Sequence, residues 1–171
     1  MEKGAPGKGL PAGGRLPGGG PPAGAHAEVK GGEIVVASPE GARLWRASAA
    51  TIEWDYDKQQ AVLHDVNCVF SEKDKPTLEA QAPLVKADIK RREVVLEGGV
   101  TARSLITRTS LRADRMEWKA KDKEVYATGN VKYARGDFVI TGERLRADLA
   151  LKRARLVGGV QMQAVEPFKS K

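Results

Sequence analysis

The sequence predicts an all-β domain made of four copies of one unit. One pattern recurs along the chain, apolar and polar residues alternate within each copy, and a residue type that tolerates a positive φ stands at the same place in each. The copies are Leu44–Phe70, Leu78–Arg103, Leu111–Ala134 and Ile140–Gln163. Helical spacing of apolar residues does not persist beyond one turn, so a helical fold is disfavoured.

The first 32 residues differ in composition from the rest of the chain. They hold 11 of the 19 glycines and 5 of the 9 prolines, and this composition disfavours packing into a core. We therefore expect residues 1–32 to form a disordered tail rich in Gly, Pro and Ala. Residues 33–165 are expected to form the folded domain, and residues 166–171 a C-terminal tail.

Alternation with a period of two predicts the strands. In the third copy, Met116 and Trp118 alternate with Glu117 and Lys119, as side chains do when they point to opposite faces of a half-buried strand. The unit then stacks on itself and buries one side. The inner face predicted in this way includes Ile52, Trp54, Tyr56, Cys68, Val85, Ala87, Val100, Met116, Trp118, Val131, Tyr133, Leu145, Val160, Met162 and Ala164.

Each copy closes on a valine, and the residue before it predicts a bend. The valines are Val66, Val100, Val131 and Val160, and the residues before them are Asp65, Gly99, Asn130 and Gly159. Asp, Asn and Gly adopt a positive φ at little cost. We expect a tight bend or a β-bulge at each of these places.

Composition and motifs disfavour an enzyme. One cysteine and two histidines far apart in sequence leave no intramolecular disulfide and no familiar metal site, so no metal or cofactor is expected. His64 and Asp65 are neighbours whose side chains would point to opposite faces, and Cys68 replaces residues that are apolar or aromatic in the other copies, which favours a buried, inert thiol. The tripeptide Arg135-Gly136-Asp137 is expected to form a hairpin turn.

The net charge of the chain indicates less about function than the motifs do. A net charge of +7 favours an anionic partner only slightly. A nucleic-acid surface would interleave exposed aromatic residues with Lys and Arg, whereas here the aromatic residues are expected inside. No apolar run is long enough for a membrane helix, and no secretory signal is visible.

The recurring signature resembles a known family. The segments Gly129-Asn130-Val131 and Gly158-Gly159-Val160 resemble the OstA-type domain of the LptA/LptC lipopolysaccharide-transport proteins, and Leu44-Trp45-Arg46-Ala47 favours an LptC-like member. The resemblance covers residues 33–165. It implies an open, twisted β-jellyroll built from four repeats of short antiparallel strands, acting without catalysis in outer-membrane biogenesis of the Gram-negative envelope.

The resemblance also implies a lipid groove and two partner edges. The groove, which shields the acyl chains of lipopolysaccharide, would be lined by Ile52, Trp54, Val85, Ala87, Val100, Met116, Trp118, Val131, Tyr133, Leu145, Val160 and Met162. Ile34, Val35 and Val36 would pair with the jellyroll of the inner-membrane Lpt transporter. Val160, Gln161, Met162 and Gln163 would pair with an LptA-like bridge protein.

Two points stay open at this stage. The family implies a periplasmic location at the inner membrane, yet residues 1–32 resemble neither a membrane helix nor a signal, so the anchor would come from a longer start or from another protein. The aromatic residues and methionines on the inner face could equally fill a closed core. The alternative function is therefore a protein-interaction scaffold that has the same strands and no lipid site.

Overall fold

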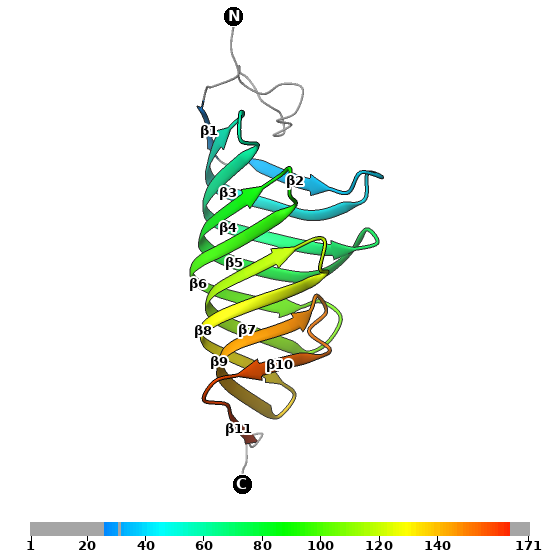
Figure 1. The fold of residues 1–171 in the computed structure, drawn as a ribbon, viewed down its shortest axis with the longest axis vertical. Coiled ribbons are helices and arrows are strands. Elements are labelled where there is room, and N and C mark those ends of the chain that lie inside the picture. Colours follow the sequence, from blue (N-terminus) through cyan, green and yellow to red (C-terminus); the bar gives the residue numbers. More distant parts are fainter. Residues whose placement is uncertain (1–25, 31, 165–171) are drawn as a thin grey trace, which may run out of the picture.

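The computed structural model describes residues 26–30 and 32–164, which form one antiparallel sheet of 11 strands (Figure 1). The strands are β1 (His26–Lys30), β2 (Glu33–Ala37), β3 (Arg43–Asp55), β4 (Gln60–Glu72), β5 (Lys75–Asp88), β6 (Glu93–Ser104), β7 (Thr109–Lys119), β8 (Glu124–Arg135), β9 (Phe138–Asp148), β10 (Ala154–Val157) and β11 (Gln161–Ala164). Their order is β1-β3-β4-β5-β6-β7-β8-β9-β10, with β2 also beside β3 and β11 also beside β9. Within these residues there is no helix with the length and hydropathy to span a membrane.

The predicted fold class is confirmed, and each of the first three copies of the repeat is a hairpin. The first three copies correspond to β3–β4, β5–β6 and β7–β8, and the fourth contains β9, β10 and β11. The strands from β3 to β9 have between 11 and 14 residues. They are longer than expected because the chain passes through each bend without leaving the sheet.

The bends occur at the predicted places. Asp65, Gly99, Asn130 and Gly159 have φ values of 56°, 101°, 48° and 58°. The pairing register shifts beside two of these residues, Gly99 and Asn130, for example between Glu97 and Val100 where β6 faces β7. Because a bulge bends and twists the strand that carries it, bulges aligned on neighbouring strands fold the whole sheet along one line.

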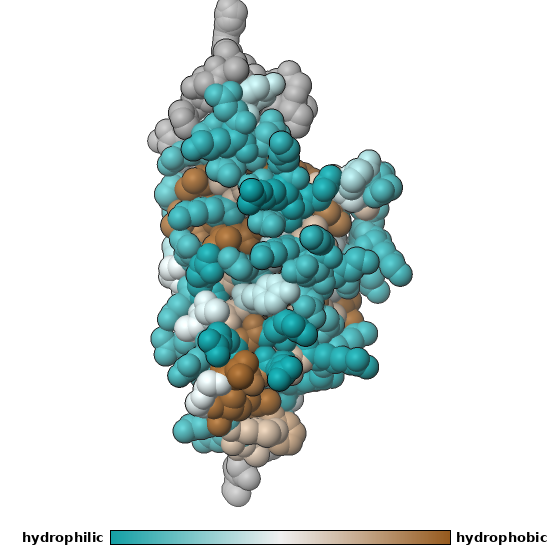
Figure 2. Space-filling view, viewed as in Figure 1, coloured by the Kyte–Doolittle hydropathy of each residue, from teal (hydrophilic) through white to brown (hydrophobic). Residues whose placement is uncertain are grey.

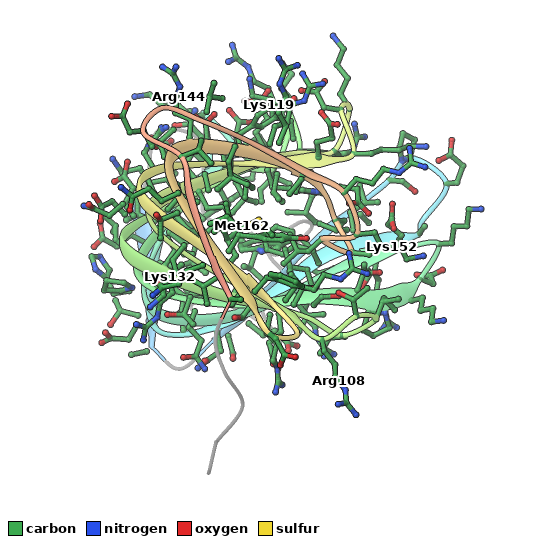
Figure 3. All side chains as sticks on the ribbon, turned by 90° about the horizontal axis from the view of Figure 1, so that it is seen from below. Arg108, Lys119, Lys132, Arg144, Lys152 and Met162 are labelled. Carbon is green, nitrogen blue, oxygen red and sulfur yellow. The ribbon has the colours of Figure 1, made fainter. Side chains whose placement is uncertain are left out.

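This line divides the sheet into two walls. Wall A contains the half of each long strand that lies next to β1 and β10: residues 51–55, 60–64, 84–88, 93–97, 115–119, 124–128 and 144–148, together with β1 and β10 themselves. Wall B contains the other half of each long strand: residues 43–49, 66–72, 75–82, 100–104, 109–113, 131–135 and 138–142, together with β2 and β11. Viewed from the C-terminal end, Lys119 and Arg144 lie on the outside of wall A, and Arg108 and Lys132 on the opposite side (Figure 3). The space between the walls is the interior.

Apolar side chains fill this interior. Trp45, Phe70, Leu63, Leu78 and Met116 are among the largest fully buried residues. The ring centroid of Phe70 lies 6.4 Å from that of Trp45 on wall B and 5.3 Å from that of Trp118 on wall A. The two walls are thus held together by direct packing of side chains, and the molecule has one continuous hydrophobic core.

The turns at the edge of wall A are stacked on one another. The backbone N–H of Ile89 donates to the carbonyl of Gln59 over 2.9 Å, and that of Ala120 donates to the carbonyl of Arg92 over 3.0 Å. Gln59, Arg92 and Lys123 all have a positive φ. Each turn is therefore aligned by the previous one, which keeps successive hairpins in register.

Four expectations about the inner face are wrong. Tyr56 is 37% exposed because β3 ends at Asp55 and the tyrosine lies in the turn. Val160 and Met162 are 48% and 62% exposed, and Ala164 is exposed as well. These last three residues belong to the final copy, where no further hairpin is present among the described residues to cover them.

The N-terminal boundary of the folded unit also differs from the expectation. β1 pairs with β3 from His26↔Asp55 to Lys30↔Thr51, within the stretch expected to be a tail. The pairing therefore begins before residue 33. The rest of the predicted tail, and the short C-terminal one, lie outside the described residues.

Candidate functional site

A seam separates the walls on the side opposite the bends. The hairpin turns of wall A, at 56–59, 89–92, 120–123 and 149–153, form one lip of the seam. The turns of wall B, at 38–42, 73–74, 105–108 and 136–137, form the other lip. Lys152 marks this open side when the molecule is viewed from its C-terminal end (Figure 3). The seam is the route by which a ligand could reach the interior.

A pocket of about 710 Å³ opens on the seam. It is lined by Glu40, Ala42, Leu44, Ser71, Glu72, Lys73, Lys75, Thr77, Ile106, Trp118, Ala120, Lys123, Leu149, Ala150 and Lys152, which come from both lips. This volume falls within the range of roughly 300–1,000 Å³ that is usual for small-molecule sites. We call this cavity the seam pocket.

The seam pocket has an apolar floor and a basic rim. Trp118 and Leu149, each 2% exposed, lie at its base. Its rim carries four lysines, Lys73, Lys75, Lys123 and Lys152, against two glutamates, Glu40 and Glu72. None of these lysines forms an ion pair with another described residue. The arrangement suits an amphiphile with an apolar body and an anionic head.

Hydrogen bonds join the lips of the seam in two places. Arg92 of wall A donates from Nε to the carbonyl oxygen of Ala37 of wall B over 3.0 Å. At the other end, three side chains of wall B, those of Thr107, Tyr133 and Arg135, donate to the carbonyls of Ala150, Leu151 and Lys152 over 3.2, 2.8 and 3.0 Å. We call these contacts the latches, because any widening of the seam must break them.

Most groove residues predicted from the sequence are buried between the walls. Ile52, Trp54, Val85, Ala87, Val100, Met116, Trp118, Val131, Tyr133 and Leu145 are at most 6% exposed, whereas Val160 and Met162 are on the surface. Among the twelve, only Trp118 lines the seam pocket. The other nine buried residues pack in the core.

Sequence reasoning missed most of the seam pocket. Ala120 follows Met116 and Trp118 in the alternating stretch of the third copy, and Leu44 opens the first copy, but neither was expected to line a groove. The lysines lie in or beside turns, where charged residues are common in any hairpin. Nothing in their spacing distinguishes them from other turn lysines such as Lys58, because the seam brings together residues far apart in sequence.

The two edges of the sheet differ in character. At the N-terminal edge, Ile34 and Val36 of β2 are buried and Val35 is 43% exposed. At the C-terminal edge all four residues of β11 are exposed. Phe138, Val157, Val160 and Met162 there are among the exposed large apolar residues, and Figure 2 shows hydrophobic surface gathered around β10 and below it. Large exposed apolar groups beside a free strand edge are typical of an interaction site.

The remaining polar residues of interest have structural roles. His64 pairs with Glu53 across the strands over 3.2 Å and has no contact with Asp65 that forms a catalytic pair. Burial raises the pKa of the Cys68 thiol to about 12, with a smaller opposing effect of the Trp45 indole, so this thiol is inert. Gly136 has a φ of 58° in the turn between β8 and β9, as expected for a hairpin.

One donor in the core has no partner. The indole nitrogens of Trp45 and Trp54 are both buried. The nitrogen of Trp45 faces the thiol of Cys68, whereas that of Trp54 makes no hydrogen bond within the described part of the chain. A buried donor without an acceptor costs about 1–3 kcal/mol.

Comparison with known proteins gives a structural neighbour and a family. The fold is similar to the crystal structure of LptH, described as the LptA-homologous periplasmic component of the lipopolysaccharide transport device of Pseudomonas aeruginosa, with a TM-score of 0.60 and 14% identity over 72% of this chain and 95% of that one. No curated protein sequence matches. Residues 29–165 match the lipopolysaccharide-assembly, LptC-related family. The chain therefore belongs to this family of non-enzymatic transport proteins.

Proposed function

We propose that this protein carries lipopolysaccharide by holding its acyl chains between the two walls. The family has a role in lipopolysaccharide transport, and the observation that carries the finer proposal is the seam pocket, with its apolar floor and lysine rim. Acyl chains would enter between Trp118 and Leu149, and the phosphate groups of the lipid would remain at the rim beside Lys123 and Lys152.

Burial of hydrocarbon supplies the affinity. Each CH₂ group removed from water contributes about 0.8 kcal/mol. The core is packed along most of its length, so deeper insertion requires the walls to separate, and the latches set how easily they do so. The groove residues predicted from the sequence, such as Met116 and Tyr133, would then contact the chains, and methionine adapts well to a mobile apolar ligand.

Transfer to and from this protein would use the edges of the sheet. An extended strand can add to a free edge through main-chain hydrogen bonds. We place the transporter jellyroll of the inner membrane at Ile34, Val35 and Val36, and an LptA-like bridge protein at Val160, Gln161, Met162 and Gln163. The exposed state of Met162 and Val160 fits a role in contact with a partner better than a role in the groove. Such a bridge requires a periplasmic location next to the inner membrane.

Lipopolysaccharide capture by the purified chain tests this proposal. The double variant Lys123→Glu/Lys152→Glu changes the rim, and Lys58→Glu/Lys90→Glu changes the charge equally on turns that do not line the pocket. We expect the rim variant to bind lipopolysaccharide about tenfold more weakly, which corresponds to about 1.4 kcal/mol, and the control to bind as the unmodified chain does. Equal affinity of both variants, or no capture by the unmodified chain, would contradict a lipid site at the seam.

The alternative function is a protein-interaction scaffold. The packed core favours it, because the interior needs no ligand to be filled. A scaffold would bind partners through its edges and would capture no lipopolysaccharide in the same experiment.

A further inference from the structure

We propose that the strand which docks on β10 carries acidic residues on its outward face, and that an arginine cluster beside this edge selects it. The inference rests on the edge pairing in the proposed function and adds the chemistry of the partner. The cluster consists of Arg144 and Arg146 on β9 and Arg155 on β10.

The three arginines lie together on the outer face of wall A. Arg144 and Arg146 are two residues apart on one strand, so their side chains share a face, and Arg155 is directly opposite Arg146 in the register. Together with Tyr126, Thr128 and Val157 they line a cleft of about 290 Å³. In the view from the C-terminal end, Arg144 lies at the outer rim, and Met162 lies over the middle of the molecule (Figure 3).

The cluster has too few carboxylates for its charge. Glu124 pairs with Arg146 over 3.4 Å and also accepts a hydrogen bond from Tyr126 over 3.3 Å. Asp148 accepts the backbone N–H of Arg153 over 2.8 Å. Arg144 and Arg155 form no ion pair with the described residues.

This arrangement is unfavourable in the isolated chain. Like charges directly opposite each other on neighbouring strands destabilise the pair, and Arg146 faces Arg155 in this way. A carboxylate brought close to Arg155 would turn that repulsion into an attraction, and guanidinium groups bind carboxylates in a two-pronged geometry. The excess charge is therefore suited to an acidic partner.

The free edge places such carboxylates next to the cluster. β10 pairs with β9 on one side and with no strand on the other among the described residues. Every second side chain of an added strand points outward and lies beside the outward residues of β10, which are Arg155 and Val157. An added strand with Glu or Asp at those positions would meet the guanidinium of Arg155 directly.

β11, at the same edge of the sheet, lacks this feature. The outward residues of β11 are Gln161 and Gln163, which are neutral. Within the C-terminal edge, the excess of positive charge therefore lies beside β10 and not beside β11.

An anionic membrane surface fits this face less well than an acidic strand does. A membrane would contact a broad area of wall A, and the neighbouring strands present Glu97 and Glu117 there, each bound to Arg115. The arginines of this face that form no ion pair with the described residues, Arg144 and Arg155, lie on β9 and β10 at the edge itself. A narrow, extended partner is the shape that matches it.

Three synthetic peptides test the proposal on the full chain. They are ten residues long and share valine at every second position, with Glu, Gln or Lys at the positions between. Binding is followed by the shifts of assigned backbone amide resonances, which report whether β10 is the strand contacted. We expect the Glu peptide to bind at least about tenfold more tightly than the Gln peptide, and the Lys peptide to bind most weakly.

Variants test whether the arginine cluster, and not the overall positive charge of the protein, selects the Glu peptide. Arg144→Gln and Arg155→Gln should each remove most of the preference for Glu over Gln, whereas Arg112→Gln should leave it unchanged. Arg112 is a matched control because it is exposed on wall B and forms no ion pair with the described residues. All three changes are at exposed positions, so the fold should be retained.

The possible outcomes are distinct. Equal binding of all three peptides at β10 would overturn the charge selection and leave the edge pairing intact. Binding of the Glu peptide away from β10, or no binding of any peptide, would overturn the inference as well. Cosedimentation with phosphatidylglycerol vesicles that depends on Arg144 and Arg155, without a Glu preference among the peptides, would assign the cluster to a membrane instead. Lipopolysaccharide capture is measured separately, so its failure is distinguishable from each of these.

Discussion

The side chain of Arg92 donates a hydrogen bond to the carbonyl of Ala37, 55 positions earlier in the chain, over 3.0 Å. Arg92 lies in a turn of wall A, and Ala37 ends the first strand of wall B. The bond therefore closes the seam across its width. Under the proposed function the walls open along this line, so this contact would control access as well as stability.

Removal of the Arg92 latch should make lipid capture easier. Arg92→Ala deletes one hydrogen bond, whose net contribution is about 0.5–1.5 kcal/mol, and we expect lipopolysaccharide to be captured about 2- to 10-fold faster. The neighbouring variant Arg91→Ala is the control, because no hydrogen bond of the Arg91 side chain crosses the seam. Equal capture rates for the two variants would show that the latch does not limit opening.

The hydrogen bond of the Tyr133 latch should contribute more to stability than an exposed hydrogen bond does, because it is buried. The Tyr133 hydroxyl donates to the carbonyl of Leu151 over 2.8 Å, and Tyr133→Phe removes this donor. We expect the free energy of unfolding to fall by about 1–3 kcal/mol, as measured by urea denaturation. Tyr126→Phe is the comparison, since its hydroxyl binds Asp122 at an exposed position. A smaller loss for Tyr133→Phe than for Tyr126→Phe would contradict the assignment.

The bends should be sensitive to a single added methyl group. Gly129 has a φ of 83°, and a Cβ there would lie 2.5 Å from Oδ2 of Asp114. We expect Gly129→Ala to destabilise the protein by about 2–3 kcal/mol. Gly136→Ala, at a positive φ with open space around it, should cost only about 1 kcal/mol. Thermal unfolding of both variants measures the difference, and equal shifts in Tm would argue against a crowded bend.

The buried thiol should make stability depend on pH in the alkaline range. The pKa of Cys68 is raised to about 12 in the folded state, against about 8.5 in an unfolded chain. Above pH 8.5 the unfolded chain loses the proton and the folded one keeps it, so stability falls as pH rises. Between pH 8.5 and 10 the contribution of Cys68 should fall by about 2 kcal/mol.

Cys68→Ala provides the control for this effect. The variant loses packing at every pH, but the part of the slope that comes from the thiol should disappear below pH 10. The pKa of Tyr126 is also raised to about 12, by partial loss of hydration and by hydrogen bonds and charges from Asp122 and Glu124, which is why the comparison stops at pH 10. Identical slopes for the two proteins would contradict a buried, neutral Cys68.

Local patterns in the sequence predicted the strands and bends, because both features depend on residues that are close together in the chain. Alternation identified the buried face, as at Met116 and Trp118, and Asn130 and Gly159 marked the bends through their tolerance of a positive φ. The prediction that Met162 is buried was wrong. Alternation indicates which side of the sheet a side chain points to, but it does not indicate whether another strand covers that side. Among the described residues no further strand covers β11, so its inner face is open.

The seam pocket was out of reach for a different reason. Its lining joins Leu44, Ile106 and Leu149, which lie in three different repeats or between them. Only the fold of the sheet along its bend line brings these residues together. The arginine cluster is similar, because Arg155 meets Arg146 through the short hairpin between β9 and β10, whose register depends on the turn at Leu151 with its positive φ.

Photo-crosslinking in cells tests the central claim most directly. A photoreactive residue at Met116 or Trp118, which are 0% and 2% exposed between the walls, is compared with one at Glu117 or Lys119 on the outer face. Export of each protein to the periplasm is arranged and verified first. The account predicts adducts with lipopolysaccharide at 116 and 118 and none at 117 and 119. No adduct at any of the four positions in a folded, exported protein would contradict the lipid function.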